Sequence, residues 1–432
     1  MNKNVNKYFH FLLLLMVASP ACSQGDDAPI SDSVLGVVDT SLVRKYKFIH
    51  FGLNRFEFPN RESKNFERFY QKFDSLTNYD GKDINVYHIG GSHIQADIYS
   101  NQFRKNVQEF GPGLKGSRGW IFPYTLVGTN NPSHYKVESL GEWKGVFNTM
   151  RKDTSEIGLM GAAAVTNDSI SSMRVYFRKS EQRYFSNKVR VYHNTSVSTY
   201  KVEWENPKAV VSSSVNIAGG YTEFILKQAI DTISLKFVKV LNEKNDFRLY
   251  GVQLLINEPG FVYQTIGVNG AGFTSYERCK LFETHLAQSK PDMFIISIGT
   301  NEANVDEFNA EDFEKKYSSM VDKVKAINPS CAFLFTVPND AGYKKTNNKN
   351  IPVMRESIFK LAKKYDAGVW DWFSIMGGFG SSVTWLKNEL MHKDRIHFTY
   401  DGYLLKGDLF YEAFLKYLDE YEFNRLVKAT NR

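Results

Sequence analysis

The stretch Phe294-Ile295-Ile296-Ser297-Ile298 is almost entirely apolar and is followed directly by Gly299-Thr300-Asn301-Glu302. A strand that is apolar on both faces is typical of a parallel sheet covered by helices on both sides. Downstream, helical periodicity at 310–327, 354–365 and 403–421 alternates with apolar strands at 331–337 and 367–373. This alternation predicts an α/β fold built on a doubly wound parallel sheet.

Another apolar strand is expected far upstream, at 84–89, where it ends at Gly90-Gly91-Ser92-His93. Amphipathic helices are expected before it, at 55–76, and after it, at 97–110. The residues from about 135 to 256 have a different residue pattern. They form short alternating runs of β-branched and aromatic residues, separated by Asn, Ser, Gly and Lys turns, which predicts an inserted all-β sandwich.

The chain of 432 residues is longer than a single core usually takes, and it divides into five predicted parts. Residues 1–22 are expected to be a lipoprotein signal peptide, and 23–45 a flexible tether. Residues 46–125 and 259–432 are the two parts of the α/β domain, and 126–258 are the inserted β-sandwich domain.

The N-terminus predicts export. An apolar run at 11–18, preceded by lysines, is too short to span a bilayer. Small residues and then Cys22 follow, similar to the lipobox of bacterial lipoproteins, although Ser19 and Pro20 stand where a Leu and a small residue are usual. We expect acylation of Cys22 and anchoring in the envelope of a Gram-negative-type bacterium, on its periplasmic or outer-surface face. Ordinary cleavage beside an unrelated cysteine is the alternative.

The composition limits the possible partners. The formal charge of +7 is spread along the chain, without the basic stripe and interleaved aromatics that nucleic-acid binding needs. We therefore expect no nucleic-acid partner, and the charge is compatible with a mild attraction to acidic cell-wall polymers. No Cys/His cluster has metal-ligand spacing. Cys279 and Cys331 are either buried thiols or a disulfide, and the spacing does not decide between them.

Polar motifs stand after several predicted strands, where an open α/β sheet has its active crevice. A serine hydroxyl becomes a good nucleophile when a histidine accepts its proton, and a carboxylate on the other ring nitrogen fixes the tautomer. Ser92 is the candidate nucleophile and His397 the candidate base. Asp394, three residues earlier, is the candidate orienting carboxylate.

Attack on an ester carbonyl creates an oxyanion, which needs preorganised donors. The candidates are the backbone amides of Ser92 and Gly270 and the side-chain amide of Asn301. Each motif alone has an ordinary explanation, as a glycine turn, an Asx-type cap or a surface turn. Their order, and their common position outside α/β strands, favour the catalytic interpretation.

The motifs in this order resemble those of the SGNH/GDSL hydrolases, named for their Ser, Gly, Asn and His. The resemblance covers roughly 55–120 and 260–425, and implies a flavodoxin-like sheet. It also implies Ser92 as nucleophile, Gly270 and Asn301 in the oxyanion hole, and Asp394 with His397 completing the triad. Two positions depart from the pattern. The usual Asp before the serine is Gly91, which bears on how the turn is braced, and the usual Asp after the Asn is Glu302.

Longer stretches narrow the resemblance. Residues 89–97, 110–113, 118–123 and 266–271, with the β insert between them, look like the peptidoglycan O-acetylesterase branch, whose members carry a carbohydrate-module-like β-sandwich. This implies a serine esterase that removes O-acetyl groups from a cell-wall or other polysaccharide through an acyl-enzyme on Ser92. It implies no metal or organic cofactor. The expected partners are an acetylated glycan and, through the anchor, a membrane; the oligomeric state stays open.

Two other functions stay open. An O-acyltransferase on the same scaffold would share the acyl-enzyme and pass the acyl group to a second sugar. A non-catalytic, glycan-binding surface lipoprotein would carry an esterase domain that has lost its activity. The presence of Ser92, Asn301, Asp394 and His397 argues against this function.

Other polar and aromatic residues have less specific interpretations. His93, Gln95 and Asp97 are candidates for the cleft wall, although His93 can equally cap the next helix. His392 is expected to be a loop histidine. The residues assigned to packing are Tyr403, Trp370 and Trp372. The aromatic residues Trp120, Phe122 and Tyr124 form either a sugar-stacking platform or a packed hinge between domains.

Overall fold

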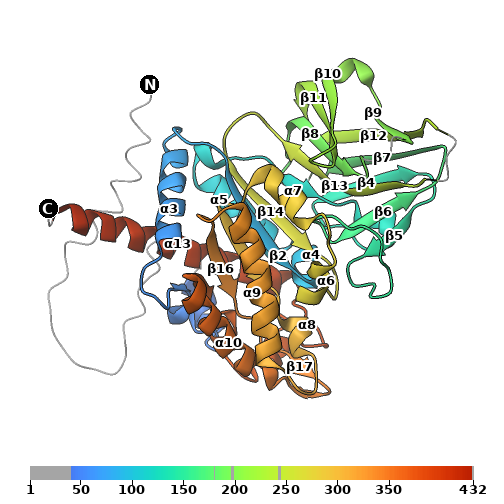
Figure 1. Cartoon of the computed structure of the whole chain (residues 1–432). Helices are drawn as coiled ribbons and strands as arrows, with labels where there is room; N and C mark the ends of the chain where they lie inside the picture. Colours follow the sequence, from blue (N-terminus) through green and yellow to red (C-terminus); the bar gives the residue numbers. More distant parts are fainter. Residues whose placement is uncertain (1–39, 180, 196–198, 242–244, 431–432) are drawn as a thin grey trace, which may run out of the picture. The chain divides into compact units, whose positions relative to one another are not determined.

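The computed structural model describes residues 40–179, 181–195, 199–241 and 245–430 (Figure 1). Residues 37–432 form one compact unit, which contains every element named below. Cys22 and the predicted signal peptide lie outside the described residues. None of the helices in the described ranges is long and apolar enough to cross a membrane.

The central sheet has six strands in the order β1-β19-β16-β15-β2-β14. Its parallel strands, in chain order, are β2 (Ile84–Gly90), β14 (Phe261–Gly267), β15 (Met293–Ser297), β16 (Ala332–Thr336) and β19 (Gly368–Trp370). Numbered along the chain, these five strands lie in the spatial order 2-1-3-4-5, which is the flavodoxin-like, doubly wound order. The predicted fold class is therefore confirmed.

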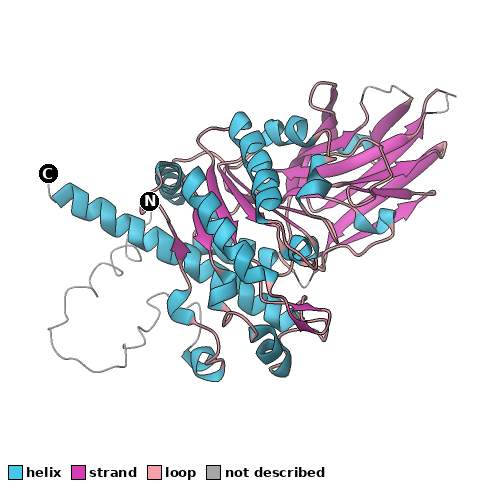
Figure 2. Cartoon of the chain, turned by 60° about the horizontal axis from the view of Figure 1, so that its bottom comes forward, coloured by secondary structure: helices cyan, strands magenta, loops and turns pink. Residues whose placement is uncertain are grey.

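Helices cover both faces of this sheet, which explains why its strands are apolar throughout. They are α3 (Lys64–Thr77), α5 (Tyr99–Phe110), α9 (Ala310–Ile327), α10 (Asn350–Tyr365) and α13 (Tyr400–Thr430). On one face the ring of His88 contacts Phe410 of α13. On the other face Phe335 contacts Tyr317 of α9. Figure 2 separates this helix-rich part from the strand-rich part.

Several expected elements have different bounds; α10, for example, begins at Asn350 and α13 at Tyr400. Two of the differences have a clear structural reason. The helix expected at 55–76 begins only at Lys64, and β1 (Phe56–Glu57) precedes it as an antiparallel edge strand on β19. Phe56 pairs with Trp370, and its ring packs against α13, so tertiary packing overrides the helical spacing. The strand expected at 367–373 ends at Trp370, because the side chain of Asp371 caps a new helix, α11 (Trp372–Ile375), by accepting from the Ser374 amide.

The strand-rich part consists of two antiparallel sheets between β2 and β14 in the sequence. One contains β3 (Gly119–Ile121), β5 (Lys144–Phe147), β6 (Ala162–Thr166), β8 (Ser186–His193), β10 (Val210–Asn216), β11 (Tyr221–Ile230) and β13 (Phe247–Leu255). The other has the order β4-β7-β12-β9, with β4 (Tyr135–Leu140), β7 (Ile170–Phe177), β12 (Thr232–Lys239) and β9 (Tyr200–Trp204).

The two antiparallel sheets pack on each other through aromatic rings. Trp204 contacts Phe224, and Phe237 contacts Phe247 with ring centroids 4.6 Å apart. This is the inserted all-β region that the sequence predicts. Strand β3 pairs with β13 although it precedes residue 126, and the domain boundaries at 125/126 and 258/259 stay predictions.

A buried ionic cluster connects the helix-rich part to the strand-rich part. Asp97, before α5, accepts from Arg118 at 2.8 Å and from Arg104 at 3.0 Å, and His134 lies 3.7 Å away. All four side chains are at most 2% exposed. Burial alone would raise the pKa of Asp97, but Arg104 and Arg118 outweigh it and lower that pKa to about 2. Asp97 is therefore a structural carboxylate and not part of a cleft wall.

The aromatic stretch after Arg118 is packed at the same junction. Trp120 and Phe122 are fully buried and Tyr124 is 3% exposed. Tyr124 donates to the carbonyl of Gly267, and Tyr135 donates to the carbonyl of Phe122. A sugar-stacking platform is excluded for these rings, and the packed-hinge interpretation holds.

Candidate active site

Ser92 lies on a tight turn between a strand and a helix. Helix α4 (Ser92–Gln95) begins directly after β2. A Cβ at Gly90 would lie 2.4 Å from the Ile94 side chain and 2.9 Å from the Ser297 carbonyl oxygen. A Cβ at Gly267 would lie 2.2 Å from the Gln95 nitrogen. The ends of β2 and β14 therefore have to be glycine for α4 to pack against them.

The hydroxyl of Ser92 begins a chain of hydrogen bonds at this edge of the sheet. Its Oγ lies 2.8 Å from Nε2 of His397, and Nδ1 of His397 lies 2.7 Å from Oδ2 of Asp394. The His397 and Asp394 side chains are 38% and 45% exposed. These two side chains are thus accessible to a substrate. The three predicted residues form a chain of hydrogen bonds, although Ser92 lies about three hundred positions before the other two.

Asp394 is held as a carboxylate by its own turn. Its Oδ1 accepts from the backbone amides of Ile396 and His397, at 2.9 and 3.0 Å. Partial burial raises the pKa of Asp394, but the hydrogen bonds from the His397 ring and from these amides outweigh it, so the pKa lies below its usual range. An ionised Asp394 favours the tautomer of His397 that has its hydrogen on Nδ1 and a free lone pair on Nε2.

The candidate oxyanion donors come from the ends of neighbouring strands. Asn301, in α8 (Thr300–Ala303) after β15, donates one amide hydrogen to the carbonyl of Ala271 at 2.9 Å. Its second amide hydrogen has no hydrogen bond among the described residues. A Cβ at Gly91 would lie 3.2 Å from Asn301 Nδ2, so the amide lies directly beside the Ser92 turn.

Gly270 belongs to the loop that follows β14. Gly267 pairs with Gly90 in the parallel register, so this loop and the Ser92 turn start at the same level of the sheet. Gly270 has φ +76°, a left-handed conformation that glycine adopts at little cost, and it is exposed. Oε1 of Glu302 accepts from the Phe273 amide at 2.8 Å, which ties this loop to α8 a second time.

The departure at Gly91 is compensated by another side chain. Tyr276, in α6 (Phe273–Glu277), donates its hydroxyl hydrogen to the carbonyl of Gly90 at 2.7 Å. Helix α6 directly follows the loop that carries Gly270, so this bond connects the Ser92 turn to the end of the candidate oxyanion loop. Residue 91 has φ −98°, outside the left-handed region, and a Cβ there would make a close contact of 3.2 Å with the Asn301 amide.

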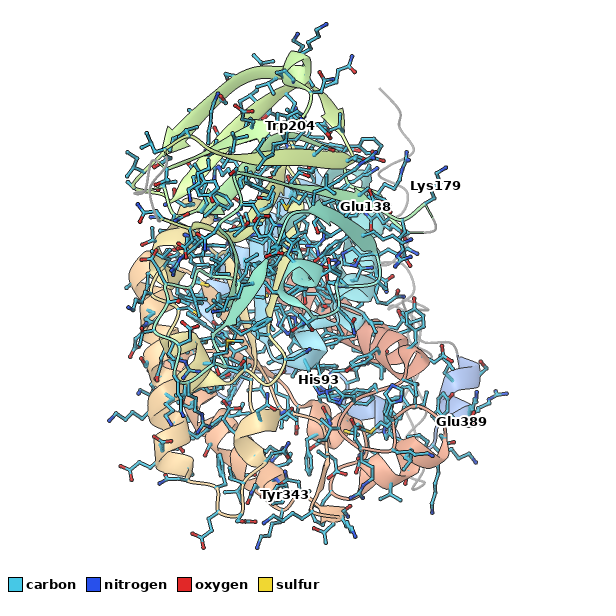
Figure 3. The ribbon with its side chains drawn as sticks, turned by 90° about the vertical axis from the view of Figure 1, so that its right-hand side faces the viewer. His93, Glu138, Lys179, Trp204, Tyr343 and Glu389 are labelled. Atoms are coloured by element: carbon cyan, nitrogen blue, oxygen red, sulfur yellow. The ribbon has the colours of Figure 1, made fainter. Side chains whose placement is uncertain are left out.

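The candidate base has a neighbour that no sequence pattern indicates. The ring of His93, labelled in Figure 3, packs against that of His397 with centroids 5.2 Å apart and planes at 32°. Tyr403, which we assigned to packing alone, places its hydroxyl 2.8 Å from His93 Nδ1. No spacing rule links positions 93 and 403; only the fold brings α13 beside α4.

His93 is kept neutral by its surroundings. Burial lowers the pKa of His93 well below its usual range, and the neighbouring Lys406 and His397 lower it further. Lys406 is itself buried, over the rings of Tyr99 and Trp372 at 4.5 and 5.3 Å, and burial lowers its pKa to about 7. A neutral His93 can pack on His397 without repelling the imidazolium that forms when His397 takes up a proton.

The remaining candidates have structural positions. Gln95 accepts from the Asn269 amide at 2.7 Å and so connects α4 to the loop after β14. His392 is an exposed loop residue whose backbone amide donates to the carbonyl of His397. Cys279 and Cys331 are both buried free thiols and do not pair. Over the part of the chain that the structure describes, no group of three or more His, Cys, Asp or Glu side chains is arranged to hold a metal ion.

These features define a class of protein. The Ser92–His397–Asp394 chain lies outside the carboxyl ends of β2 and β15, where the strand order reverses, which is the usual position of the active site in open α/β sheets. The fold and the site together are those of a serine hydrolase built on a flavodoxin-like parallel sheet.

The comparisons with known proteins agree. The family described as GDSL-like Lipase/Acylhydrolase matches residues 242–405, which contain Gly270, Asn301, Asp394 and His397. Ser92 falls outside this segment because the β-rich region separates it from the rest of the domain. Residues 242–405 therefore match a GDSL-like lipase/acylhydrolase domain, and the protein is a carboxylic ester hydrolase.

Solved structures are similar to this chain to different extents. A chain described as "Peptidoglycan O-acetylesterase in action" is similar with a TM-score of 0.67 and 21% identity, over 82% of this chain and 96% of that one. A lipase/acylhydrolase from Enterococcus faecalis has 19% identity and a TM-score of 0.29, over 36% and 75% of the two chains. An acetyl xylan esterase has 20% identity and a TM-score of 0.29, over 36% and 82%. No curated protein sequence matches this chain.

Proposed function

We propose that this esterase removes O-acetyl groups from a cell-wall polysaccharide through an acyl-enzyme on Ser92. The observation that carries the proposal is the hydrogen-bonded chain from Ser92 through His397 to Asp394, with the Asn301 amide beside the serine turn. A serine, a base and an orienting carboxylate in this order are the groups that acyl transfer needs.

In the first half-reaction, Nε2 of His397 takes the hydroxyl proton of Ser92 as Oγ attacks the acetyl carbonyl carbon. The carbonyl oxygen becomes an oxyanion, which accepts from the amides of Ser92 and Gly270 and from Asn301. The C–O bond to the sugar then breaks, and the sugar oxygen takes the proton from His397. Ser92 is left as an acetyl ester.

In the second half-reaction, water takes the position of the sugar. His397 removes a proton from this water, and the resulting hydroxide adds to the acetyl carbonyl of the acyl-enzyme. The same donors hold the second oxyanion. The C–O bond to Ser92 Oγ breaks, His397 returns the proton to Oγ, and acetate leaves.

The substrate class rests on two supports. The similar structure described as a peptidoglycan O-acetylesterase aligns over 82% of this chain, more than the parallel sheet and its helices could supply, so the β-rich region takes part in the likeness. His397 and Asp394 are also more than a third exposed, and such access suits a short acyl group on a bulky polymer better than a long fatty-acyl chain.

The test is the release of acetate from O-acetylated peptidoglycan, with acetylated xylan as the competing polymer and an aryl acetate as a small ester. The wild-type protein is expected to hydrolyse the aryl acetate and to prefer peptidoglycan. Ser92→Ala is expected to lower turnover of every ester by a factor of about 10³ or more, since the triad acts as a unit. The circular dichroism spectrum should not change. Wild-type turnover by Ser92→Ala would refute the acyl-enzyme, and equal rates on both polymers would refute the substrate class.

We also propose that the protein is exported and anchored through a lipid on Cys22. The support is the sequence alone, with its short apolar run followed by small residues and Cys22. Metabolic labelling with a radioactive fatty acid is expected to mark the wild-type protein and not Cys22→Ser. Equal labelling of both would refute the anchor without affecting the esterase proposal.

A further inference from the structure

A groove of about 630 Å³ lies on the outer face of the β4-β7-β12-β9 sheet and in the turn after β7. Five cationic side chains line it: Lys136, Arg174, Arg178, Lys179 and Arg183. Figure 3 labels Glu138 and Lys179, which project from the outside of these strands. The hollow is therefore open, strongly basic and separate from the candidate triad.

The strand register explains how these cations come together. Lys136 of β4 lies opposite Tyr176 of β7, and Glu138 lies opposite Arg174. Met173, Val175 and Phe177 of β7 are buried, so the alternate residues Arg174 and Tyr176 face outward with Lys136. Residues distant in the sequence thus form one surface row.

Most of this positive charge is not neutralised by the protein. Arg183 pairs with Asp231 at 3.2 Å, and Glu138 accepts from the hydroxyl of Tyr176 at 3.0 Å. Lys136, Arg174, Arg178 and Lys179 have no ion pair and no side-chain hydrogen bond within the described ranges. Like charges gathered in a hollow repel one another, and an anion that enters relieves this repulsion.

We propose that this groove binds an acidic polysaccharide chain. Arginine and lysine would hold its carboxylates, with arginine able to bind them in a bidentate manner. The carboxylates of Glu138 and Asp231 and the hydroxyl of Thr232 also line the groove and can accept hydrogen bonds from sugar hydroxyls. A lining that mixes cations with acceptors fits a chain that carries both anionic groups and hydroxyls. The proposal goes beyond the proposed esterase function and does not depend on it.

Other polyanions fit the groove less well. A lipid bilayer presents a flat surface of anionic headgroups and reaches protruding cations better than those that line a hollow. Single-stranded nucleic acid needs several aromatic faces for its bases. The aromatic residues in the groove lining are Tyr176, whose hydroxyl is bonded to a carboxylate, and Phe177, which is buried.

Hydrogen bonds connect the residues beside the groove to the Asp97 cluster and to α5. The Arg178 amide donates to the carbonyl of His134, which belongs to the Asp97 cluster. Tyr184, next to Arg183, donates to Gln108 of α5 at 3.0 Å. The base of the groove is therefore preformed, and a bound chain does not have to order it.

The test uses the full chain and measures binding to polygalacturonate, with neutral dextran as the uncharged polymer and phosphatidylglycerol vesicles as the lipid surface. The groove variant is Lys136→Gln with Arg174→Gln. The matched control is Lys208→Gln with Lys227→Gln, two exposed lysines on the same strand-rich part that lie outside the groove lining. Both double variants remove the same charge, so only position differs.

We expect the wild-type protein to bind polygalacturonate in a salt-dependent manner and not to bind dextran. The groove variant should bind about tenfold more weakly, while the control should stay within about twofold. Lys179→Gln alone should weaken binding in the same direction by a smaller factor. Aryl acetate turnover should be wild-type in all these variants, and Ser92→Ala should still bind the polymer. Turnover thus reports the proposed ester chemistry and binding reports the groove.

Three outcomes would overturn the proposal. Equal weakening by the groove and control variants would mean that net charge alone attracts the polymer. Equal binding to dextran would mean that the cations are not used. If the wild-type protein bound vesicles but not polygalacturonate, and the groove variant no longer bound vesicles, the groove would be a membrane-contact surface instead.

Discussion

At the scale of single residues, the candidate base is supported from both sides. Asp394 holds one ring nitrogen of His397, and the ring of His93 packs against the ring of His397. His93 is in turn held by the Tyr403 hydroxyl. This hydroxyl belongs to the helix that follows the His397 loop, so one small set of contacts couples the loop, the helix and the serine turn.

Tyr403→Phe tests this support. Removing the hydroxyl leaves His93 Nδ1 without its bond, which allows the His93 ring to move and loosens the packing on His397. We expect kcat for an aryl acetate to fall about tenfold with KM nearly unchanged, because the loss concerns the orientation of the base and not substrate binding. Steady-state kinetics with thermal melting measures both activity and folding.

The matched control is Tyr400→Phe, an exposed tyrosine at the start of the same helix, 53% exposed. It should leave kcat at the wild-type value. A Tyr403→Phe enzyme with wild-type kcat, or one whose KM rises while kcat stays constant, would show that the hydroxyl serves packing alone.

At the scale of elements, the site depends on how closely α4 approaches the strand ends. Gly90 and Gly267 leave no room for a side chain between β2, β14 and the helix. The loops after β14 and β15 are tied together by Asn301 and Glu302, and Tyr276 ties them to the serine turn. The candidate oxyanion hole is thus assembled by hydrogen bonds from side chains to the backbone of elements that are not adjacent in the sequence.

Gly90→Ala should therefore disturb both stability and activity. The new methyl group would lie 2.4 Å from Ile94 and 2.9 Å from the Ser297 carbonyl oxygen, so α4 would have to shift. We expect a loss of about 1–3 kcal/mol in the free energy of unfolding, together with a fall in kcat. Denaturant unfolding gives the first value and aryl acetate hydrolysis the second.

Gly52→Ala serves as the control, since a Cβ at Gly52 would meet nothing within 4 Å. If Gly90→Ala were as stable and as active as Gly52→Ala, the close approach of α4 to β2 would not be a requirement of the site.

At the scale of the whole described chain, the two antiparallel sheets and the parallel sheet are joined by a buried charge cluster. Asp97 stands between Arg104 of α5 and Arg118, which precedes β3, with His134 before β4. A buried carboxylate with two guanidinium partners is costly to disturb, because removing it leaves uncompensated positive charges in the interior. The same junction supports the base of the basic groove through His134 and Arg178.

Asp97→Asn is expected to destabilise the protein by about 3–5 kcal/mol, as measured by denaturant unfolding. The pKa of Asp97 is lowered in the folded state to about 2. Its stabilisation is therefore fully present above the unfolded pKa and is lost as pH falls from about 4 toward 2. The stability difference between wild type and Asp97→Asn should shrink over that interval.

The control is Asp246→Asn, which breaks a partly exposed pair with Arg248, 27% and 26% exposed. It should cost less than about 1 kcal/mol. A cost of the same size for both variants, or a difference between wild type and Asp97→Asn that does not change between pH 5 and 2, would contradict the depressed pKa of Asp97.

Much of the architecture could be predicted because its signals are local. The continuous apolar run at Phe294 and the 3.6-residue period at 310–327 are properties of adjacent residues, and α9 has the expected bounds. The helix predicted from residue 55 was wrong at Phe56. The spacing of Phe56 suits a helix, whereas its backbone pairs with β19 and its ring packs on α13. The end of β19 at Trp370 could not be predicted, because the apolar residues continue past it and only the Asp371 cap shows that a new helix begins.

Residue type and position after strands were enough to predict a catalytic role for Ser92, Asn301, Asp394 and His397. Which residues support them could be seen only once the elements were packed together. His93 and Tyr403, Glu302 and Phe273, and the basic groove from Lys136 to Arg183 are pairs and sets formed by packing between distant elements. The physical reason is that side-chain contacts of this kind depend on the register and crossing of elements, which no local pattern in the chain specifies.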